Sequence, residues 1–96
     1  MITLLSSWTD TETVEVEKKI RGKYVLFEVE VDIETRHYER DCHTEMEEEF
    51  TDTRIIESSW EDDDGEYNIL DSVDTIKILT EKQLQDVCQK AEELAC

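Results

Sequence analysis

The stretch that decides the fold is residues 24–34, YVLFEVEVDIE. Apolar and acidic side chains alternate along it with a period of two, which is typical of a β-strand with one buried face. The apolar side chains share one face and the acidic ones share the other: Val25, Phe27, Val29, Val31 and Ile33 against Glu28, Glu30, Asp32 and Glu34. We therefore predict a half-buried strand whose outer face is a row of carboxylates.

The segment before this stretch shows the same alternation. In residues 12–20, Val14, Val16 and Ile20 fall on one side and charged side chains on the other. Residues 21–23 separate the two segments, and Gly22 supplies the backbone freedom that a tight turn needs. The two segments together predict a β-hairpin with a basic tip.

The next part of the chain is harder to assign. Residues 35–52 are polar, charged and poor in periodicity, and we interpret them as a loop with some helical content. Residues 54–60 and 66–70 are predicted as a third and a fourth strand, joined by a tight acidic turn at residues 61–65. Residues 1–8 are apolar and predict a short strand or an anchoring arm.

The C-terminal part predicts one helix. Thr80 with Gln83 matches a capping box, in which the hydroxyl accepts a backbone N–H that lacks a partner. An apolar stripe at helical spacing follows: Leu84, Val87, Cys88, Ala91, Leu94 and Ala95. Residues 71–79 are interpreted as a connecting segment with three side chains packed on the sheet: Val73, Ile76 and Leu79.

These elements predict a single α+β domain over residues 1–96. A small antiparallel sheet, made of the β-hairpin and one or two further strands, packs against one C-terminal helix. A chain of 96 residues is long enough for one domain and no more.

The charge is strongly negative. There are 27 acidic residues against 10 basic ones, a net charge of -17. Residues 28–66 hold 17 of the acids and only three bases. Because phosphates and anionic lipids would be repelled, we expect no direct binding to nucleic acid or membranes, and a basic protein is the favoured partner.

Metal binding and catalysis find little support in the sequence. A calcium loop with Gly65 at its sixth position would begin at Trp60, which cannot ligate the ion. His37, Cys42 and His43 lack the fourth ligand and the paired spacing of a zinc site. No phosphate loop or nucleophile motif is present. We expect no enzymatic activity, no cofactor and no bound metal.

The N-terminal segment lacks the pattern of a secretory signal, and no apolar run is long enough to cross a membrane. Three cysteines without regular spacing, Cys42, Cys88 and Cys96, are expected to be reduced thiols. A cytoplasmic location follows as the expectation, which is the host cytoplasm if the chain is encoded by a phage.

The C-terminal third resembles small acidic proteins encoded by bacteriophages. The resemblance covers residues 54–95 and rests on the segment DTIKILT at residues 74–80, followed by Leu84 and Val87. Phage proteins of this size and charge include anti-CRISPR and anti-restriction inhibitors, and several resemble DNA in their charge layout. The resemblance implies inhibition of a nuclease by occupying its nucleic-acid groove, and it carries over no functional residue.

Our leading hypothesis is an acidic interaction protein that mimics nucleic-acid phosphates. On a strand, residues i and i+2 lie about 6.6 Å apart, which resembles the spacing of successive phosphates. The predicted contact residues are the acidic clusters and one tryptophan: Glu28, Glu30, Asp32, Glu34, Glu47, Glu48, Glu49, Asp62, Asp63, Asp64 and Trp60. The alternative is a small structural or assembly protein that uses an apolar interface formed by Trp8, Trp60 and the N-terminal arm. A homodimer is compatible with either.

Overall fold

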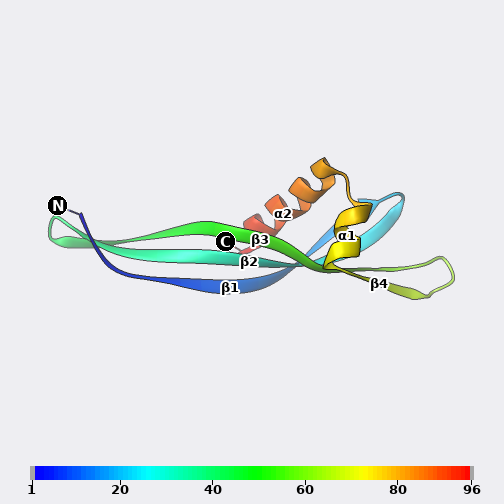
Figure 1. Cartoon of the computed structure of the whole chain (residues 1–96), viewed down its shortest axis with the longest axis horizontal. Coiled ribbons are helices and arrows are strands. Elements are labelled where there is room, and N and C mark those ends of the chain that lie inside the picture. The colour runs from blue at the N-terminus through cyan, green and yellow to red at the C-terminus, as the bar shows by residue number, and fades with distance from the viewer. Residues whose placement is uncertain (1, 96) are drawn as a thin grey trace.

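The structure is a computed structural model that describes residues 2–95, so the expectations for Met1 and Cys96 lie outside the described residues. Within that range, four strands and two helices follow one another: β1 (Ile2–Ile20), β2 (Lys23–Arg40), β3 (His43–Glu61), β4 (Tyr67–Asp71), α1 (Ser72–Ile78) and α2 (Glu81–Ala95). The strands form one antiparallel sheet in the order β1-β2-β3-β4, and both helices lie on the same side of it (Figure 1). The α+β class is confirmed, but the sheet is larger than predicted and carries two helices instead of one.

The molecule is elongated because three of its four strands, β1, β2 and β3, are each 18 or 19 residues long. A strand of 19 residues at about 3.3 Å per residue spans about 63 Å, and the molecule measures 63 × 21 × 19 Å. The prediction of a loop at residues 35–52 is wrong, because this segment continues β2 and β3 and contains only the turn between them. The sequence of this segment shows no strand pattern, because both faces of these strands are open to water. A strand of this kind needs no alternation of apolar and polar side chains.

Two-residue turns close both long hairpins. Arg21 and Gly22 have φ angles of 50° and 82°, and Asp41 and Cys42 have 44° and 75°. Two consecutive residues with positive φ match the twist of antiparallel strands. The predicted β-hairpin at residues 12–34 is therefore confirmed, and β2 and β3 form a second hairpin in place of the predicted loop.

The core lies under α2, in one half of the ribbon. The alternation in β2 predicted this face correctly, because Phe27, Val29 and Val31 are fully buried. Val87 and Ala91 of α2 are also fully buried and pack against them. Leu84 and Ala95 pack at the margin of this core, while Leu94 of the predicted stripe is half exposed.

The predicted capping box at the start of α2 is confirmed. The Gln83 backbone N–H donates to Thr80 Oγ1 at 3.2 Å, and the Thr80 backbone N–H donates to Gln83 Oε1 at 2.9 Å. The two side chains thus satisfy backbone donors at the helix start that the helix itself leaves without partners.

The predicted connecting segment before this helix is in fact α1. Asp71 caps its N-terminus by accepting from the Asp74 backbone N–H at 2.8 Å. Val73 and Ile76 do not pack on the sheet as predicted, because they are 62% and 46% exposed. The short helix turns Thr75 inward instead, and of the three predicted apolar contacts only Leu79 reaches the core.

A buried polar contact fixes α1 to β3. The hydroxyls of Ser58 and Thr75 lie 2.7 Å apart, and both side chains are almost fully buried. Thr75→Val should lower the free energy of unfolding by about 1–3 kcal/mol, because it leaves the Ser58 hydroxyl buried without this partner. The measurement is urea denaturation of the single and double variants.

The double variant Ser58→Ala/Thr75→Val is the control for this prediction. Neither hydroxyl of the pair is left without its partner when both are removed together. The double variant should therefore lose less free energy of unfolding than Thr75→Val alone. Equal losses in the two variants would show that the hydroxyl contact does not couple α1 to β3.

Candidate partner-binding surface

The side of the sheet opposite the helices, called the open face below, carries the predicted carboxylate row. Residues of β2 alternate between the two sides, so burial of Phe27, Val29 and Val31 directs their neighbours outward. The four predicted residues lie in line on this face: Glu28, Glu30, Asp32 and Glu34. The structure therefore brings this part of the predicted contact set together.

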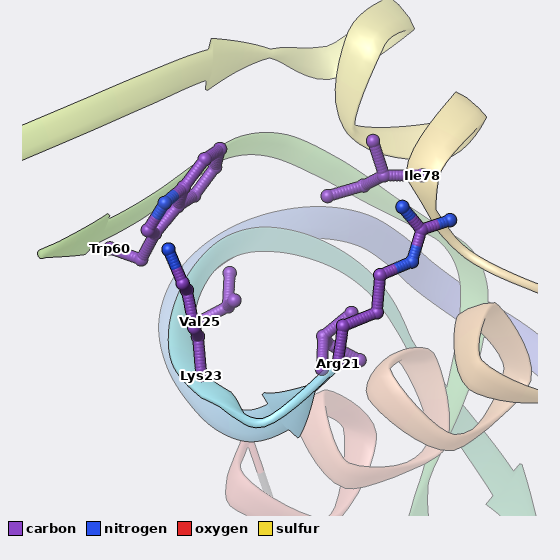
Figure 2. A pocket seen from close by; sticks show the side chains of 6 residues that line it. Arg21, Lys23, Val25, Trp60 and Ile78 are labelled. Carbon is purple, nitrogen blue, oxygen red and sulfur yellow. The ribbon is translucent and has the colours of Figure 1, made fainter. Parts of the chain in front are cut away.

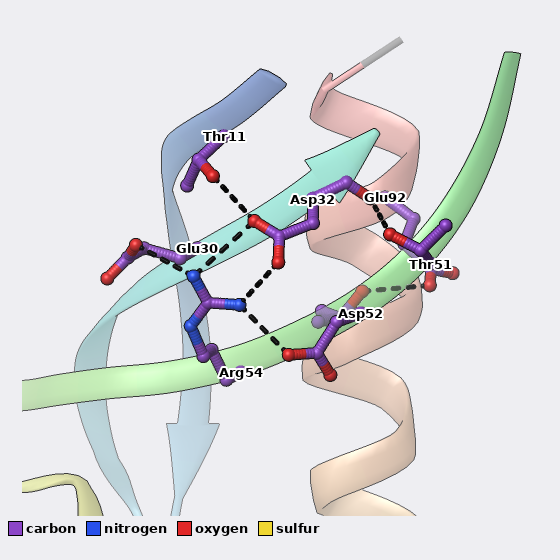
Figure 3. A network of polar contacts seen from close by, with 8 residues as sticks. Thr11, Glu30, Asp32, Thr51, Asp52, Arg54 and Glu92 are labelled. Atoms are coloured by element: carbon purple, nitrogen blue, oxygen red, sulfur yellow. Dashed lines mark hydrogen bonds and ion pairs between the residues drawn. The ribbon is translucent and has the colours of Figure 1, made fainter. Parts of the chain in front are cut away.

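Arginines neutralise most of this row. Arg54 of β3 lies beside it and contacts three carboxylates (Figure 3). Arg54 Nη1 lies 2.8 Å from Asp32 and 2.9 Å from Asp52, and its Nη2 lies 3.1 Å from Glu30. Glu34 lies 2.9 Å from Arg36 Nε, and the other end of this guanidinium contacts Glu49. Within residues 2–95, Glu28 is the one carboxylate of the row without such a contact.

These contacts change the ionisation of the row. The hydrogen bond from Arg54 lowers the pKa of the Asp32 carboxyl below its ordinary value, and a hydrogen bond from Thr11 at 2.6 Å acts in the same direction. Asp32 is therefore held in its charged form by internal partners. A partner protein that bound Asp32 would have to compete with Arg54.

A cluster of three carboxylates next to the row has no such compensation. Glu15 of β1 lies directly opposite Glu28, and Glu57 of β3 lies opposite Glu28 on its other side. No ion pair connects any of these three to a cation within residues 2–95. We call Glu15, Glu28 and Glu57 the acidic triad. Like charges directly opposite one another destabilise a sheet, so this arrangement has a cost in stability.

The acidic triad borders a hollow of about 160 Å³. Besides the three carboxylates, Leu26, Ser59, Tyr67 and Ile69 line it. Tyr67 and Ile69 of β4 are 67% and 62% exposed, so an aromatic ring and an aliphatic side chain stand free beside the negative charge. Such a hollow suits a long basic side chain, whose methylene stem can lie on apolar surface while its charged end meets carboxylates.

The predicted run at residues 47–49 is divided between the two faces. Glu47 and Glu49 lie on the open face opposite Arg36 and Glu34, whereas Glu48 lies opposite Thr35 on the helix side. This is the alternation expected of a strand, and it differs from the loop predicted for residues 35–52.

The predicted acidic cluster at residues 62–64 lies in the turn between β3 and β4. The expected tight turn is present: the Gly65 backbone N–H donates to the Asp62 carbonyl at 2.9 Å, and Gly65 has a φ of 81°. Asp63 and Asp64 are exposed, but Asp62 lies 2.9 Å from Lys23 Nζ and also accepts from Asn68. The hydrogen bond from Lys23 lowers the pKa of Asp62.

Trp60 is separated from the carboxylate row of the open face, although its side chain donates a hydrogen bond to Asp62 of the acidic turn. Its ring is partly buried against the core on the helix side and lines a cavity of about 250 Å³ (Figure 2). The same cavity is lined by Arg21 and Lys23 of the hairpin tip and by Ile78 of α1. Trp60 therefore cannot join the open face in one contact area.

The residues weighed as zinc ligands do not converge. His37 and His43 lie at positions of β2 and β3 that face opposite sides, and Cys42 is an exposed free thiol in the turn. In residues 2–95, no group of three or more His, Cys, Asp or Glu side chains has an arrangement that could hold a metal ion.

The sequence interpretation missed Glu15, Glu57 and Ile69 as members of this contact area. Glu15 could have been found, because a two-residue turn at Arg21 and Gly22 fixes the hairpin register and places it opposite Glu28. Glu57 could not, because two register shifts between β2 and β3 separate it from the turn at residues 41–42.

Comparison of the chain with protein-family models, curated proteins and solved structures found no match. In the described part of the chain, no helix has the length and apolar character to cross a membrane.

Proposed function

We propose that this protein is an acidic inhibitor that binds a basic, nucleic-acid-binding protein of the cytoplasm through its open face. Its carboxylates would take the place of phosphates in a groove lined by lysine and arginine. A host nuclease is the partner class that fits, as for anti-CRISPR and anti-restriction proteins. The observation that carries the proposal is the acidic triad: three carboxylates at opposed positions that no cation of the described chain neutralises.

The triad supports binding because it breaks a local rule of sheet stability. Places where a sequence departs from such a rule are candidates for function. A lysine or arginine of a partner would relieve the repulsion among Glu15, Glu28 and Glu57. The free energy of this repulsion is present in the free protein and is removed in the complex, which favours binding. Tyr67 adds an exposed aromatic face on which a guanidinium can stack.

The paired row has a different part in this proposal. Glu30, Asp32 and Glu34 are engaged by Arg54 and Arg36, so they contribute less negative potential than a bare row would. Asp63 and Asp64 are exposed, but they lie in the turn between β3 and β4, at one end of the molecule. The contact area is therefore centred on the triad and extends to the less neutralised members of the predicted set.

The test compares two variants that remove the same charge from opposite faces. Glu15→Gln/Glu28→Gln/Glu57→Gln should weaken the affinity for an arginine-rich peptide about tenfold or more, and should lower the salt dependence of binding. The measurement is isothermal titration calorimetry at several salt concentrations. The same variant should unfold at an equal or higher temperature, because the repulsion in the sheet is removed.

The matched control is Glu12→Gln/Glu39→Gln/Glu48→Gln. These three carboxylates lie at positions of the helix side and have no cation partner in the described chain. If both triple variants lose affinity to the same extent, binding depends on net charge alone and the open face is not a specific site. An affinity for the peptide that hardly changes with salt would also contradict phosphate mimicry.

The alternative function, a structural or assembly protein, is supported by a separate observation. Ile2, Leu4, Leu5 and Trp8 of β1 are 42–54% exposed, which makes an apolar strand available to another chain. For this function, neutralising the acidic triad would leave the interaction with its partner unchanged.

A further inference from the structure

The outer edge of β1 is a strand edge without the usual protection. β1 pairs with β2 on one side only, because it is the first strand of the sheet. Its residues 2–9, ITLLSSWT, contain no charged residue and no proline, in a chain that is 39% charged. Charges, prolines and bulges are the features that keep exposed strand edges from pairing with other chains. Of these, this segment has only the bulge at Leu5.

This edge belongs to a part of the ribbon without a core. We call residues 2–9, 35–40 and 43–49 the arm; it lies beyond the C-terminal end of α2 (Figure 1). Of its side chains, only Thr35 is buried. Three strands held by hydrogen bonds with so little apolar burial are marginally stable by themselves.

The charges of the arm are distributed unevenly from one edge to the other. The β3 edge carries four glutamates: Glu45, Glu47, Glu48 and Glu49. Arg36 and Arg40 of the central strand β2 contact Glu49 and Glu45, and they separate these negative charges from β1. The β3 edge therefore repels a second acidic chain, whereas the β1 edge presents a neutral backbone and apolar side chains.

We propose that β1 pairs antiparallel with β1 of a second copy of this chain, through residues 2–9. Antiparallel pairing of two identical edges requires a two-fold axis perpendicular to the sheet, so the contact is closed and ends at a dimer. The strands of both copies then form one continuous sheet. The helices of both copies lie on one side of it and both open faces lie on the other.

The geometry of this dimer limits its electrostatic cost. Glu15 lies nine residues from Ser6, so each acidic triad stands about 30 Å along the strand from the dimer axis. That distance is well beyond the Debye length of about 8 Å at physiological salt. Repulsion between two copies with a charge of -17 each is thus screened as salt rises. The dimer leaves the open face free, so it is compatible with the proposed inhibitor and does not depend on that function.

The test is sedimentation velocity of the full chain over a range of protein concentrations, from about 0.01 M to about 0.5 M NaCl. We expect a dimer of twice 11.4 kDa whose dissociation constant falls by roughly tenfold over this range of salt. This direction is opposite to that expected for binding a basic partner, so the two proposals fail separately. A monomer at every salt and protein concentration would overturn the inference.

Matched variants on the two edges of the arm locate the contact. Leu4→Glu should abolish the dimer, because it places like charges next to the two-fold axis. Met46→Glu, on the acidic edge of the same arm, should leave it intact; both side chains are exposed, at 54% and 61%. If both variants lost the dimer to the same extent, the contact would not be specific to the β1 edge and the pairing of β1 would be refuted.

Hydrogen exchange of the unmodified protein supplies a second readout, which does not depend on how the variants fold. Backbone amides of residues 2–9 should exchange more slowly as protein concentration rises, and those of residues 43–49 should change less. Protection of both segments to the same degree, or of neither, would contradict a dimer built on the β1 edge.

Discussion

Replacing Phe27 by alanine should lower the free energy of unfolding by about 3–5 kcal/mol. Phe27 is fully buried in β2 and belongs to the one core cluster of the described chain, together with Val87 and Ala91 of α2. A domain of this size is expected to have a total stability of about 5–15 kcal/mol. The lost free energy is therefore a large fraction of the total stability. We expect α2 and the sheet to unfold together in one transition. Urea denaturation followed by circular dichroism measures it.

Phe50→Ala is the matched control, because the same atoms are removed from the same sheet. Phe50 lies near the end of α2 and is 36% exposed, so its removal leaves no closed cavity. Phe50→Ala should lower the free energy of unfolding clearly less than Phe27→Ala does. Comparable losses of unfolding free energy would mean that the core extends as far as Phe50, which contradicts a core centred under α2 on Phe27.

Arg54→Gln should have opposite effects on stability and on binding. The variant removes the cation that contacts Glu30, Asp32 and Asp52 (Figure 3), so the repulsion among these carboxylates lowers the unfolding temperature. The same change frees three carboxylates of the open face, and the affinity for an arginine-rich peptide should rise. Thermal denaturation and calorimetric titration measure the two effects.

Ionisation of Asp32 checks the cause of this effect. Because Arg54 lowers the pKa of Asp32 in the folded protein, their contact stabilises the fold above the ordinary carboxyl pKa and is lost as pH falls through the lowered value. Arg54→Gln should raise the pKa of Asp32 and leave that of Asp62 unchanged, since Lys23 lowers the latter. A titration by nuclear magnetic resonance distinguishes the two carboxyls.

Lys77→Gln is the control for Arg54→Gln, because it removes one positive charge from exposed α1. Lys77 lies 3.7 Å from Asp74 and contacts nothing on the open face. If Lys77→Gln raised the affinity for the peptide as much as Arg54→Gln, net charge and not the open face would govern binding.

The sequence by itself determined the local structure wherever one face of an element is buried. The alternation around Phe27 predicted β2 and its acidic outer face, and Thr80 with Gln83 predicted the start of α2. In both places the pattern has a local physical cause, because a period of two or a capping box needs only neighbouring residues.

Only the tertiary structure decided which charges are compensated. Counted from the turn at residues 41–42, one register shift precedes the contact of Arg54 with Asp32, and two precede the pairing of Glu57 with Glu28. Residues 35–52 showed no apolar alternation because the arm has no core, so their strands exist through hydrogen bonds to neighbours distant in sequence. Cross-strand contacts depend on register, and register is set by turns and bulges together, which no local pattern of these residues reveals.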